Sequence, residues 1–330
     1  MADIIGFENP GIDFLCTLPH LPGSNEAMYM QKQSWQGGGQ VSTGLAAASR
    51  LGAAAALCGT VGDDIFGRFC CNDLIRHGVD ISGVKVRPGG RTGFSLVLSD
   101  EETRGRSIIM RSAKTSPLLE TEIDFEMVKQ AKVLHLAWVD DIGLEAARIA
   151  KENGVTVLLD ADNYYPRLEE VYQYVDVLIA SQFVYDHYFT DDEEEKNLKT
   201  TLSWGPQVAI YTKGSKGCIG LWKGGFFCQE AFHVPVVDTV GAGDVFHGAF
   251  ASCLVRGMTP VEAAEFSSAV SAIKCTRIGG RAGIPTREMT EHFLKTGEIQ
   301  DEALDKRVAY YERGLEQLAD EKIETGCIAH

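Results

Sequence analysis

The sequence lacks the features that mark a membrane-spanning or disulfide-stabilised protein. No run of 18 apolar residues occurs among its 330 residues, so no membrane helix is expected. The first residues, MADIIGFENPGID, contain no basic segment followed by a long apolar one, so they do not resemble a signal peptide. The nine cysteines are odd in number and include no Cys-x-x-Cys pair. This usage indicates reduced cysteines in a cytoplasmic protein rather than a disulfide framework or a zinc site.

Positive charge is also scarce. Lys and Arg number 31 against 46 Asp and Glu, which gives a net charge of −15. A surface with this charge repels nucleic acid and anionic membranes. Any phosphate ligand must therefore be held by local N–H groups, a few basic side chains or a bridging cation, which favours a nucleotide bound together with a divalent metal.

No internal repeat, low-complexity block or obvious linker divides the chain. Its length suits one large α/β domain or two small ones, and an apolar content of 45% indicates a globular protein. Strands and helices alternate, as in parallel βαβ units, while the earlier strands suit a small separate sheet. The expected strands are 4–7, 11–18 (an edge strand), 28–33, 54–61, 92–98, 106–110, 133–136, 155–159, 177–179, 208–211 and 218–222. The expected helices are 43–51, 66–77, 144–153, 168–174 and a docked surface helix at 302–317.

The stretch Asp238-Thr239-Val240-Gly241-Ala242-Gly243-Asp244 is the most informative motif. Apolar residues follow it from Val245 to Leu254 at the spacing of one helix face. We therefore expect the N–H groups of 241–243 to point out of a helix N-terminus, where they can bind a phosphate. Asp244 would lie beside that phosphate as a carboxylate able to accept a proton. An anion site next to a base suggests phosphoryl transfer to a hydroxyl group.

A plain helix cap explains the same residues, because Asp is preferred at helix N-termini and Gly is common in the preceding turn. Three other sites bear on the choice. Gly37–Thr43 offers amide and hydroxyl groups suited to a polyol, and Thr212–Gly217 follows a strand and could hold the phosphates or ribose of a nucleotide. Asp13 follows the first strand and could bind two sugar hydroxyls. Each of the three also has a simple interpretation as a turn or a cap.

The order of these sites resembles that in PfkB-type, ribokinase-like carbohydrate kinases, over about residues 4–295. The matching motifs are Gly38-Gly39 with Arg50-Leu51-Gly52, Val61-Gly62-Asp63-Asp64 with Phe66-Gly67, Thr212-x-Gly214, and Asp238 to Asp244. The resemblance implies an α/β fold of the ribokinase-like three-layer α/β/α kind, with a mostly parallel central sheet and a small β-sheet lid. It implies a single kinase domain over 1–330, with lid strands from about 11–33 and 92–110 that pair to form a homodimer.

The resemblance also implies roles for individual residues in phosphoryl transfer from ATP and Mg²⁺ to a sugar. Asp244 matches the catalytic base, and the anion hole matches Gly241, Ala242 and Gly243. The sugar-binding positions are Asp13, Gly38, Gly39, Gln40 and Thr43. The nucleotide loop matches Thr212, Gly214 and Gly217. A monovalent-cation site, such as one for K⁺, matches Asp238, the carbonyl of Val240 and carbonyls of the loop Lys274–Gly279.

Two departures from the family pattern concern the sugar and the metal. Thr43 stands where the family usually has an Asn that contacts the sugar, and Thr is shorter and has no amide. The family's Asn-x-x-Glu motif, which helps to organise Mg²⁺, is replaced here by Ser181-Gln182-Phe183-Val184. Asp160 and Asp162 follow a strand and could compensate, or they could be ordinary loop carboxylates.

Two rival functions stay open at this point. A nucleoside kinase of the same family is suggested by Asn9-Pro10 before Asp13, a feature similar to adenosine kinases; it would need an aromatic side chain on the lid, such as Trp35, Phe14 or Tyr29. A catalytically silent sugar-binding or regulatory protein is suggested by the missing Asn-x-x-Glu motif. The complete Gly241–Asp244 motif opposes this second rival, because a binding protein does not need a base there.

Overall fold

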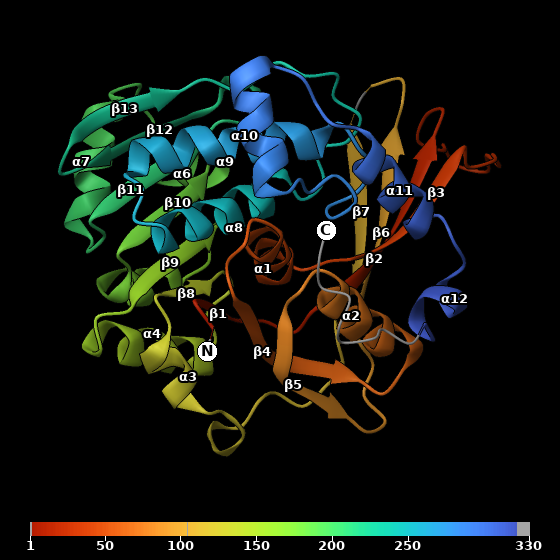
Figure 1. Cartoon of the computed structure of the whole chain (residues 1–330), viewed down its shortest axis with the longest axis horizontal. Helices are drawn as coiled ribbons and strands as arrows, with labels where there is room; N and C mark the ends of the chain where they lie inside the picture. Colours follow the sequence, from red (N-terminus) through yellow and green to blue (C-terminus); the bar gives the residue numbers. More distant parts are fainter. Residues whose placement is uncertain (1, 104, 322–330) are drawn as a thin grey trace.

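The computed structural model of the chain describes residues 2–103 and 105–321 and contains two β-sheets surrounded by helices (Figure 1). The larger sheet has nine strands in the order β13-β12-β11-β10-β9-β8-β1-β4-β5. All neighbouring pairs from β11 to β5 are parallel, and only the β11–β12 and β12–β13 pairs are antiparallel. These strands are β1 (Ile4–Phe7), β4 (Ala55–Gly62), β5 (Asp80–Arg87), β8 (Val133–Leu136), β9 (Thr156–Ala161), β10 (Val177–Ser181), β11 (Val208–Thr212), β12 (Cys218–Trp222) and β13 (Gly225–Gln229).

Helices cover both faces of this sheet. The central strands β1, β4 and β8 are buried along their whole length, as expected for parallel strands packed on two sides. Two separate apolar clusters form the two interfaces. The helices on one face are α1 (Gln40–Arg50), α2 (Ile65–Arg76), α8 (Ala242–Val255) and α9 (Pro260–Cys275). Those on the other are α3 (Phe125–Gln130), α4 (Asp141–Glu152), α5 (Leu168–Val171), α6 (Gln182–Tyr188) and α7 (Glu194–Ser203).

The smaller sheet lies at one side of the molecule, on the right in Figure 1. Its order is β3-β2-β6-β7, with β2 and β6 parallel and both outer pairs antiparallel. The strands are β2 (Gly11–Leu18), β3 (Lys32–Gly37), β6 (Gly93–Asp100) and β7 (Arg106–Arg111). This sheet contacts the body through α2, which packs against β2 and β3.

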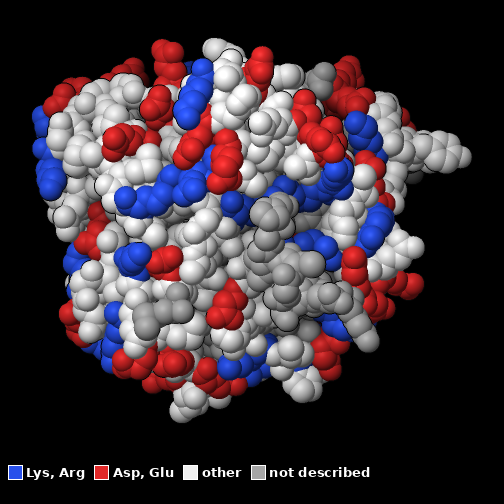
Figure 2. All heavy atoms as spheres, in the orientation of Figure 1, with Lys and Arg blue, Asp and Glu red and all other residues white. Residues whose placement is uncertain are grey.

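Three C-terminal helices complete the described chain. They are α10 (Arg287–Thr296), which packs on α9, α11 (Glu302–Tyr311), which contacts β3, and α12 (Leu315–Ala319), which packs on α2. Tyr311 is fully buried, so the tail is docked as expected from the sequence. Among the described residues, no helix is long and apolar enough to cross a membrane. Acidic side chains are spread over the face shown in Figure 2, while Lys and Arg gather in a band across its middle.

The architecture confirms the α/β class, the mostly parallel central sheet and the separate small sheet. Most predicted elements are present within one to three residues of their expected ends, but four expectations were wrong. The strand expected at 28–33 is β3, which begins only at Lys32 and ends at Gly37, and β2 is an inner strand rather than an edge. The helix expected at 168–174 is α5 followed by a single 3-10 turn, and the helix expected at 302–317 is divided into α11 and α12. The expected elements did not include β5, β13, α3, α6, α7, α9 or α10.

Candidate active site

The helix predicted after the glycine-rich motif is α8, and Gly241 is its N-cap residue. Gly241 has φ 73°, a conformation that favours glycine, and a Cβ there would lie 2.6 Å from the Cα of Gly280. A Cβ at Gly243 would meet nothing within 4 Å, so the helix start is open on that side. The first amides of a helix have no carbonyl partner within the helix. The start of α8 is therefore suited to an anion.

Asp244 lies in the first turn of α8, half-buried, next to other carboxylates. Burial, together with repulsion from Asp160 and Glu8, raises the pKa of its carboxyl group to about 8. The positive charge that His247 could carry acts in the opposite direction. A carboxylate whose pKa lies near neutrality can accept a proton more effectively than an exposed one.

Two of these charged neighbours form a buried pair, Asp160 on β9 and His247 on α8. The Nδ1 atom of His247 lies 3.2 Å from Oδ2 of Asp160, but the same nitrogen is only 2.6 Å from the carbonyl oxygen of Gly243. Its other ring nitrogen lies 3.2 Å from the carbonyl oxygen of Ile179. Within the described chain the Asp160 carboxyl group has no hydrogen-bond donor, and burial raises its pKa well above the usual value. The site thus contains more carboxylate than its own cations balance.

Close packing of α1 on α8 brings the glycine-rich loop Gly37–Thr43, which was predicted to bind the sugar, to the start of α8. A Cβ at Gly248 would lie 1.9 Å from the carbonyl oxygen of Gly44, and a Cβ at Gly44 would lie 3.2 Å from that of Asp244. Near the start of both helices, a Cβ at Gly280 would lie 3.8 Å from Cγ2 of Thr43 and from the Cα of Gly241. Helices at this distance require glycine at the crossing point.

Asp13, Gly38, Gly39 and Gln40 also lie together. A Cβ at Gly38 would be 2.5 Å from Oδ1 of Asp13, and burial raises the pKa of that carboxyl group. Glu8, which follows β1, accepts hydrogen bonds from the amides of Gln40 and Ser42 at 2.9 and 2.8 Å. The N-terminus of α1 is therefore capped from outside by Glu8 rather than left free for a ligand.

A buried arginine, Arg281, supports the loop Gly37–Thr43. The guanidinium of Arg281 is fully buried and donates to the carbonyl of Gly38 at 3.0 Å and to Oγ1 of Thr43 at 3.4 Å. It also forms an ion pair with Asp73 at 2.5 Å, and Asp73 accepts a hydrogen bond from the hydroxyl of Tyr311. Residues from α1, α2 and the C-terminal helix α11 thus share one buried polar network.

The predicted nucleotide loop follows β11. Gly214 and Gly217 have φ 56° and 85°, and the loop is a short 3-10 helix, Gly214–Lys216. Thr212 pairs with Ser181 across β10 and β11, so this loop shares the carboxyl edge of the sheet with Asp160 on β9. Among the described residues, no hydrogen bond or ion pair joins this loop to Asp244.

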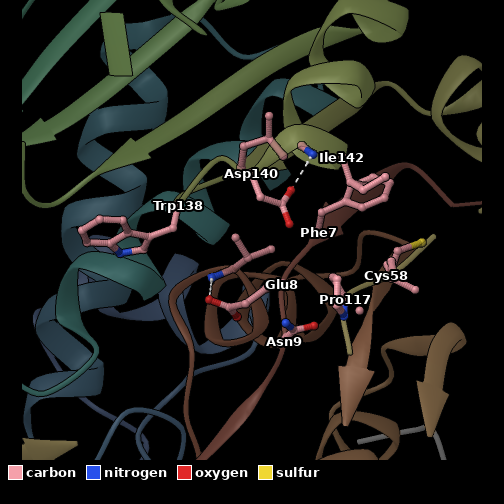
Figure 3. Close-up of a pocket in the computed structure, with 13 residues that line it drawn as sticks. Phe7, Glu8, Asn9, Cys58, Pro117, Trp138, Asp140 and Ile142 are labelled. Carbon is pink, nitrogen blue, oxygen red and sulfur yellow. Dashed lines mark hydrogen bonds between the residues drawn. The ribbon is translucent and has the colours of Figure 1, made fainter. Parts of the chain in front are cut away.

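A pocket of about 190 Å³ opens at the same edge, between the ends of β1, β4 and β8 (Figure 3). Glu8 and Asn9 line one side and Asp140 and Ile142 the other, with Phe7 between them. Trp138 extends away from Phe7, is 57% exposed and stacks on Tyr165. Carboxylate, amide and aromatic groups of this kind suit a small polar ring.

Residues 11–287 match the model of the pfkB family carbohydrate kinases. The chain belongs to the PfkB family. It is therefore a carbohydrate kinase, a phosphotransferase. A probable fructokinase-3 of Arabidopsis thaliana is 28% identical over 88% of this chain and 91% of its own length.

The solved structures give the same fold. A putative ribokinase from Agrobacterium tumefaciens superposes with a TM-score of 0.81 at 26% identity, covering 90% of this chain and 98% of its own. A putative ribokinase II from E. coli, solved with ATP and Mg²⁺, has a TM-score of 0.78 at 22% identity, covering 89% and 99%. The fold of this PfkB kinase is therefore ribokinase-like, as the motif order predicted.

The two departures from the PfkB pattern, and the Asn9 that is similar to adenosine kinases, have local structural explanations. Ser181 caps α6 by accepting from the amides of Phe183 and Val184. Thr43 is buried beside Arg281 rather than exposed. Asn9 accepts from the amide and hydroxyl of Thr60, which gives it a structural partner in β4.

Several residues of this PfkB kinase were not singled out from the sequence. Glu8, Trp138 and His247 belong to the carboxyl edge of the sheet or to α8. The side chain of Lys274 contacts the turn before Gly241, and that of Arg281 contacts Gly38. An acidic residue directly after β1 was a usable signal for Glu8. The others pair with residues far away in the sequence, and no local pattern marks them.

Proposed function

We propose that this carbohydrate kinase transfers the γ-phosphoryl group of ATP to a hydroxyl group of a small monosaccharide. The observation that carries the proposal is the position of Asp244, in the first turn of α8 and beside the α1 backbone at Gly44. The named relatives act as fructokinases and ribokinases, which makes a ketohexose or a pentose the first choice of acceptor.

The sugar binds between the small sheet and the residues Asp13, Gly38, Gly39 and Gln40. Thr43, which is buried, supports this loop through its contact with Arg281. The carboxylate of Asp244 accepts the proton of the attacking hydroxyl group while the oxygen approaches the γ-phosphorus in line. Amides of Gly241, Ala242 and Gly243 stabilise the charge on the transferred group, which is the main source of catalysis in such reactions. Thr212, Gly214 and Gly217 hold the nucleotide.

Mg²⁺ fits the charge distribution of the site. The buried carboxyl group of Asp160 has no hydrogen-bond donor within the described chain. Asp162 and Glu8 lie near enough to raise the pKa of Asp160, and Asp160 in turn raises the pKa of Asp244. No cluster of three metal-ligating side chains was found among the described residues, so a cation would arrive with the nucleotide. Asp160 and Asp162 are the side chains that would hold it, and it would neutralise phosphate charge.

The small sheet acts as a lid. Arg106 on β7 donates a hydrogen bond to Oγ1 of Thr239, 2.7 Å away, in the segment that leads into Gly241. A cleft of about 780 Å³ separates this sheet from residues 236–239 and α11. Closure of the sheet over the sugar excludes water and suppresses ATP hydrolysis.

A substrate panel tests the proposal. Purified protein is assayed for ADP release with fructose, ribose, other monosaccharides and adenosine, in the presence of ATP and Mg²⁺. We expect one monosaccharide to give the highest kcat/KM. A faster reaction with adenosine would contradict the choice of sugar and support a nucleoside kinase, and no turnover with any acceptor would support a silent binding protein. A nucleoside kinase would need an aromatic side chain to stack on the base. Phe14 and Trp35, two of the candidates, are stacked on each other, with ring centroids 4.2 Å apart.

Asp244→Asn tests the base directly. The amide keeps the shape of the side chain but cannot accept the proton. We expect kcat to fall by about 10²- to 10⁴-fold with little change in Tm. Asp192→Asn, at an exposed position, is the matched control and should keep full activity. Near-normal turnover by Asp244→Asn would show that Asp244 is not the base.

A further inference from the structure

A buried lysine lies directly beneath the start of α8. Lys274, at the end of α9, has no exposed surface. Its ammonium group donates to the carbonyl oxygen of Asp238 at 3.0 Å and to that of Val240. These two carbonyls belong to the turn that leads into Gly241, the N-cap residue of α8.

This is the place where the family resemblance puts a free monovalent cation. The residues present do not fit one. The carbonyl of Val240 already faces an ammonium group, and Gly279 presents its amide, which donates to Oδ2 of Asp238 at 2.8 Å. The other carboxylate oxygen of Asp238 accepts from the amide of Val240 at 2.9 Å. A second cation at these carbonyls would be repelled by the first at short range.

The partners of Lys274 are unusual for a buried lysine. Buried ammonium groups are normally paired with a carboxylate, because removal of the charge from water is costly. Within the part of the chain that the structure describes, the hydrogen-bond acceptors of Lys274 are main-chain carbonyl oxygens of one turn. Carbonyl oxygens around a cation are typical of a site for an alkali ion. Here the cation is the ammonium group of Lys274.

The turn held by Lys274 has little freedom to adjust. The backbone of Gly241 touches that of Gly280, and a Cβ at Gly279 would lie 2.2 Å from the side chain of Gln36. Gln36 in turn accepts from the amide of Arg281 at 2.7 Å. The position of residues 238–240 therefore fixes the direction in which the amides of the α8 start point.

We propose that the ammonium group of Lys274 is a built-in replacement for a monovalent activator ion, and that it positions the turn 238–240 and the anion hole of the kinase. Lys274 is a positioning residue, since it does not touch the reacting atoms. The proposal rests on the proposed function for its effect on catalysis. Because the cation is part of the chain, its site is filled at every salt composition, and the enzyme needs neither K⁺ nor NH₄⁺.

The test begins with the unmodified enzyme. Sugar phosphorylation is measured in buffers whose only monovalent cation is K⁺, Na⁺ or tetramethylammonium, at constant ionic strength. We expect rates that agree within about twofold. A requirement for K⁺, with a rate increase of about tenfold or more, would overturn the proposal whether or not any variant folds.

Variants then separate charge from packing. Lys274→Ala removes the ammonium group and opens space, so we expect a loss of at least about tenfold in kcat in Na⁺ buffer and recovery in K⁺ buffer. Lys274→Met fills the space without charge and should lose activity without recovery in K⁺. Lys306→Ala, an exposed lysine on α11, is the control and should match the unmodified enzyme in every buffer.

A binding measurement that needs no turnover completes the test. The Tm of Lys274→Ala should rise in K⁺ relative to Na⁺ by on the order of 2 °C, because an ion that binds only the folded state stabilises it. The Tm of the unmodified protein should not depend on the choice of cation. Equal Tm values in K⁺ and Na⁺ for Lys274→Ala, together with unchanged activity, would overturn the proposal. If no sugar is phosphorylated at all, the proposed function fails while the Tm comparison still decides on Lys274.

Discussion

At the scale of single residues, the site depends on carboxyl groups that raise one another's pKa. Asp244 must be ionised to accept a proton, so kcat/KM for the sugar should rise with pH through the pKa of about 8. Asp160→Asn removes the strongest of the repulsive charges on Asp244. Its pH profile is measured at saturating Mg²⁺, because Asp160 would also hold the cation. We therefore expect the pKa of Asp244 to fall and the acidic limb of the pH profile to move to lower pH by about one unit.

Asp162→Asn is the graded control for this change, because Asp162 contributes less to the shift of Asp244 than Asp160 does. Its profile should move in the same direction by a smaller amount. An acidic limb that stays in place in Asp160→Asn would show that the two buried carboxyl groups do not share their proton equilibrium.

The same residues show what a sequence can reveal about a site. The glycines and the aspartate of 238–244 follow one another along the chain, so their grouping is visible as a motif. The partners that decide their electrostatics are not: Asp160 meets His247 across 87 positions, and Arg281 meets Asp73 across 208. Such pairs depend on the order of strands in the sheet, which no local pattern specifies.

At the scale of elements, the crossing of α1 and α8 positions the sugar loop relative to the base. Gly248→Ala should disturb it, because the new Cβ would lie 1.9 Å from the carbonyl oxygen of Gly44 and the obstacle is main chain. We expect a loss of about 1–3 kcal/mol in the free energy of unfolding, despite the better helix propensity of alanine, and a lower kcat. Urea unfolding and steady-state kinetics measure the two effects.

Gly314→Ala is the matched control for the helix crossing. Gly314 has φ −65° and a Cβ there would meet nothing within 4 Å. Its stability should change by a few tenths of a kcal/mol at most. A Gly248→Ala protein as stable and active as this control would mean that the two helices can separate at no cost.

Helices and strands could be predicted where a single local residue pattern, such as a continuous apolar run, determines them. The buried strands β1, β4 and β12 follow continuous apolar runs and were predicted within a residue of their ends. By contrast β5 is half-exposed and contains Gly83, whose Cβ position is 2.5 Å from Sγ of Cys58, so its strand character comes from pairing with β4. The sequence around Met28 alternates as a strand would, yet pairing with β2 begins only at Lys32.

At the scale of the whole molecule, the small sheet presents an unpaired edge. Strand β7 is the last in its sheet, and its apolar side chains Ile108, Ile109 and Met110 are 46, 59 and 77% exposed. An exposed apolar edge strand is a template for pairing with another chain. We therefore expect the lids of two copies to pair along β7, which buries these side chains and ties lid closure in one copy to the other.

Light scattering coupled to size-exclusion chromatography should give twice the chain mass of 36.0 kDa at micromolar concentration. Ile109→Lys places a charge in the middle of the edge and should yield the monomer, because a buried unpaired charge costs more than one apolar contact supplies. Val261→Lys, on the exposed part of α9, changes an apolar residue of similar exposure far from the lid and should leave the dimer intact. A monomeric unmodified protein, or an Ile109→Lys protein of unchanged mass, would exclude pairing through this edge, and the exposed side chains of β7 would then belong to an unpaired lid.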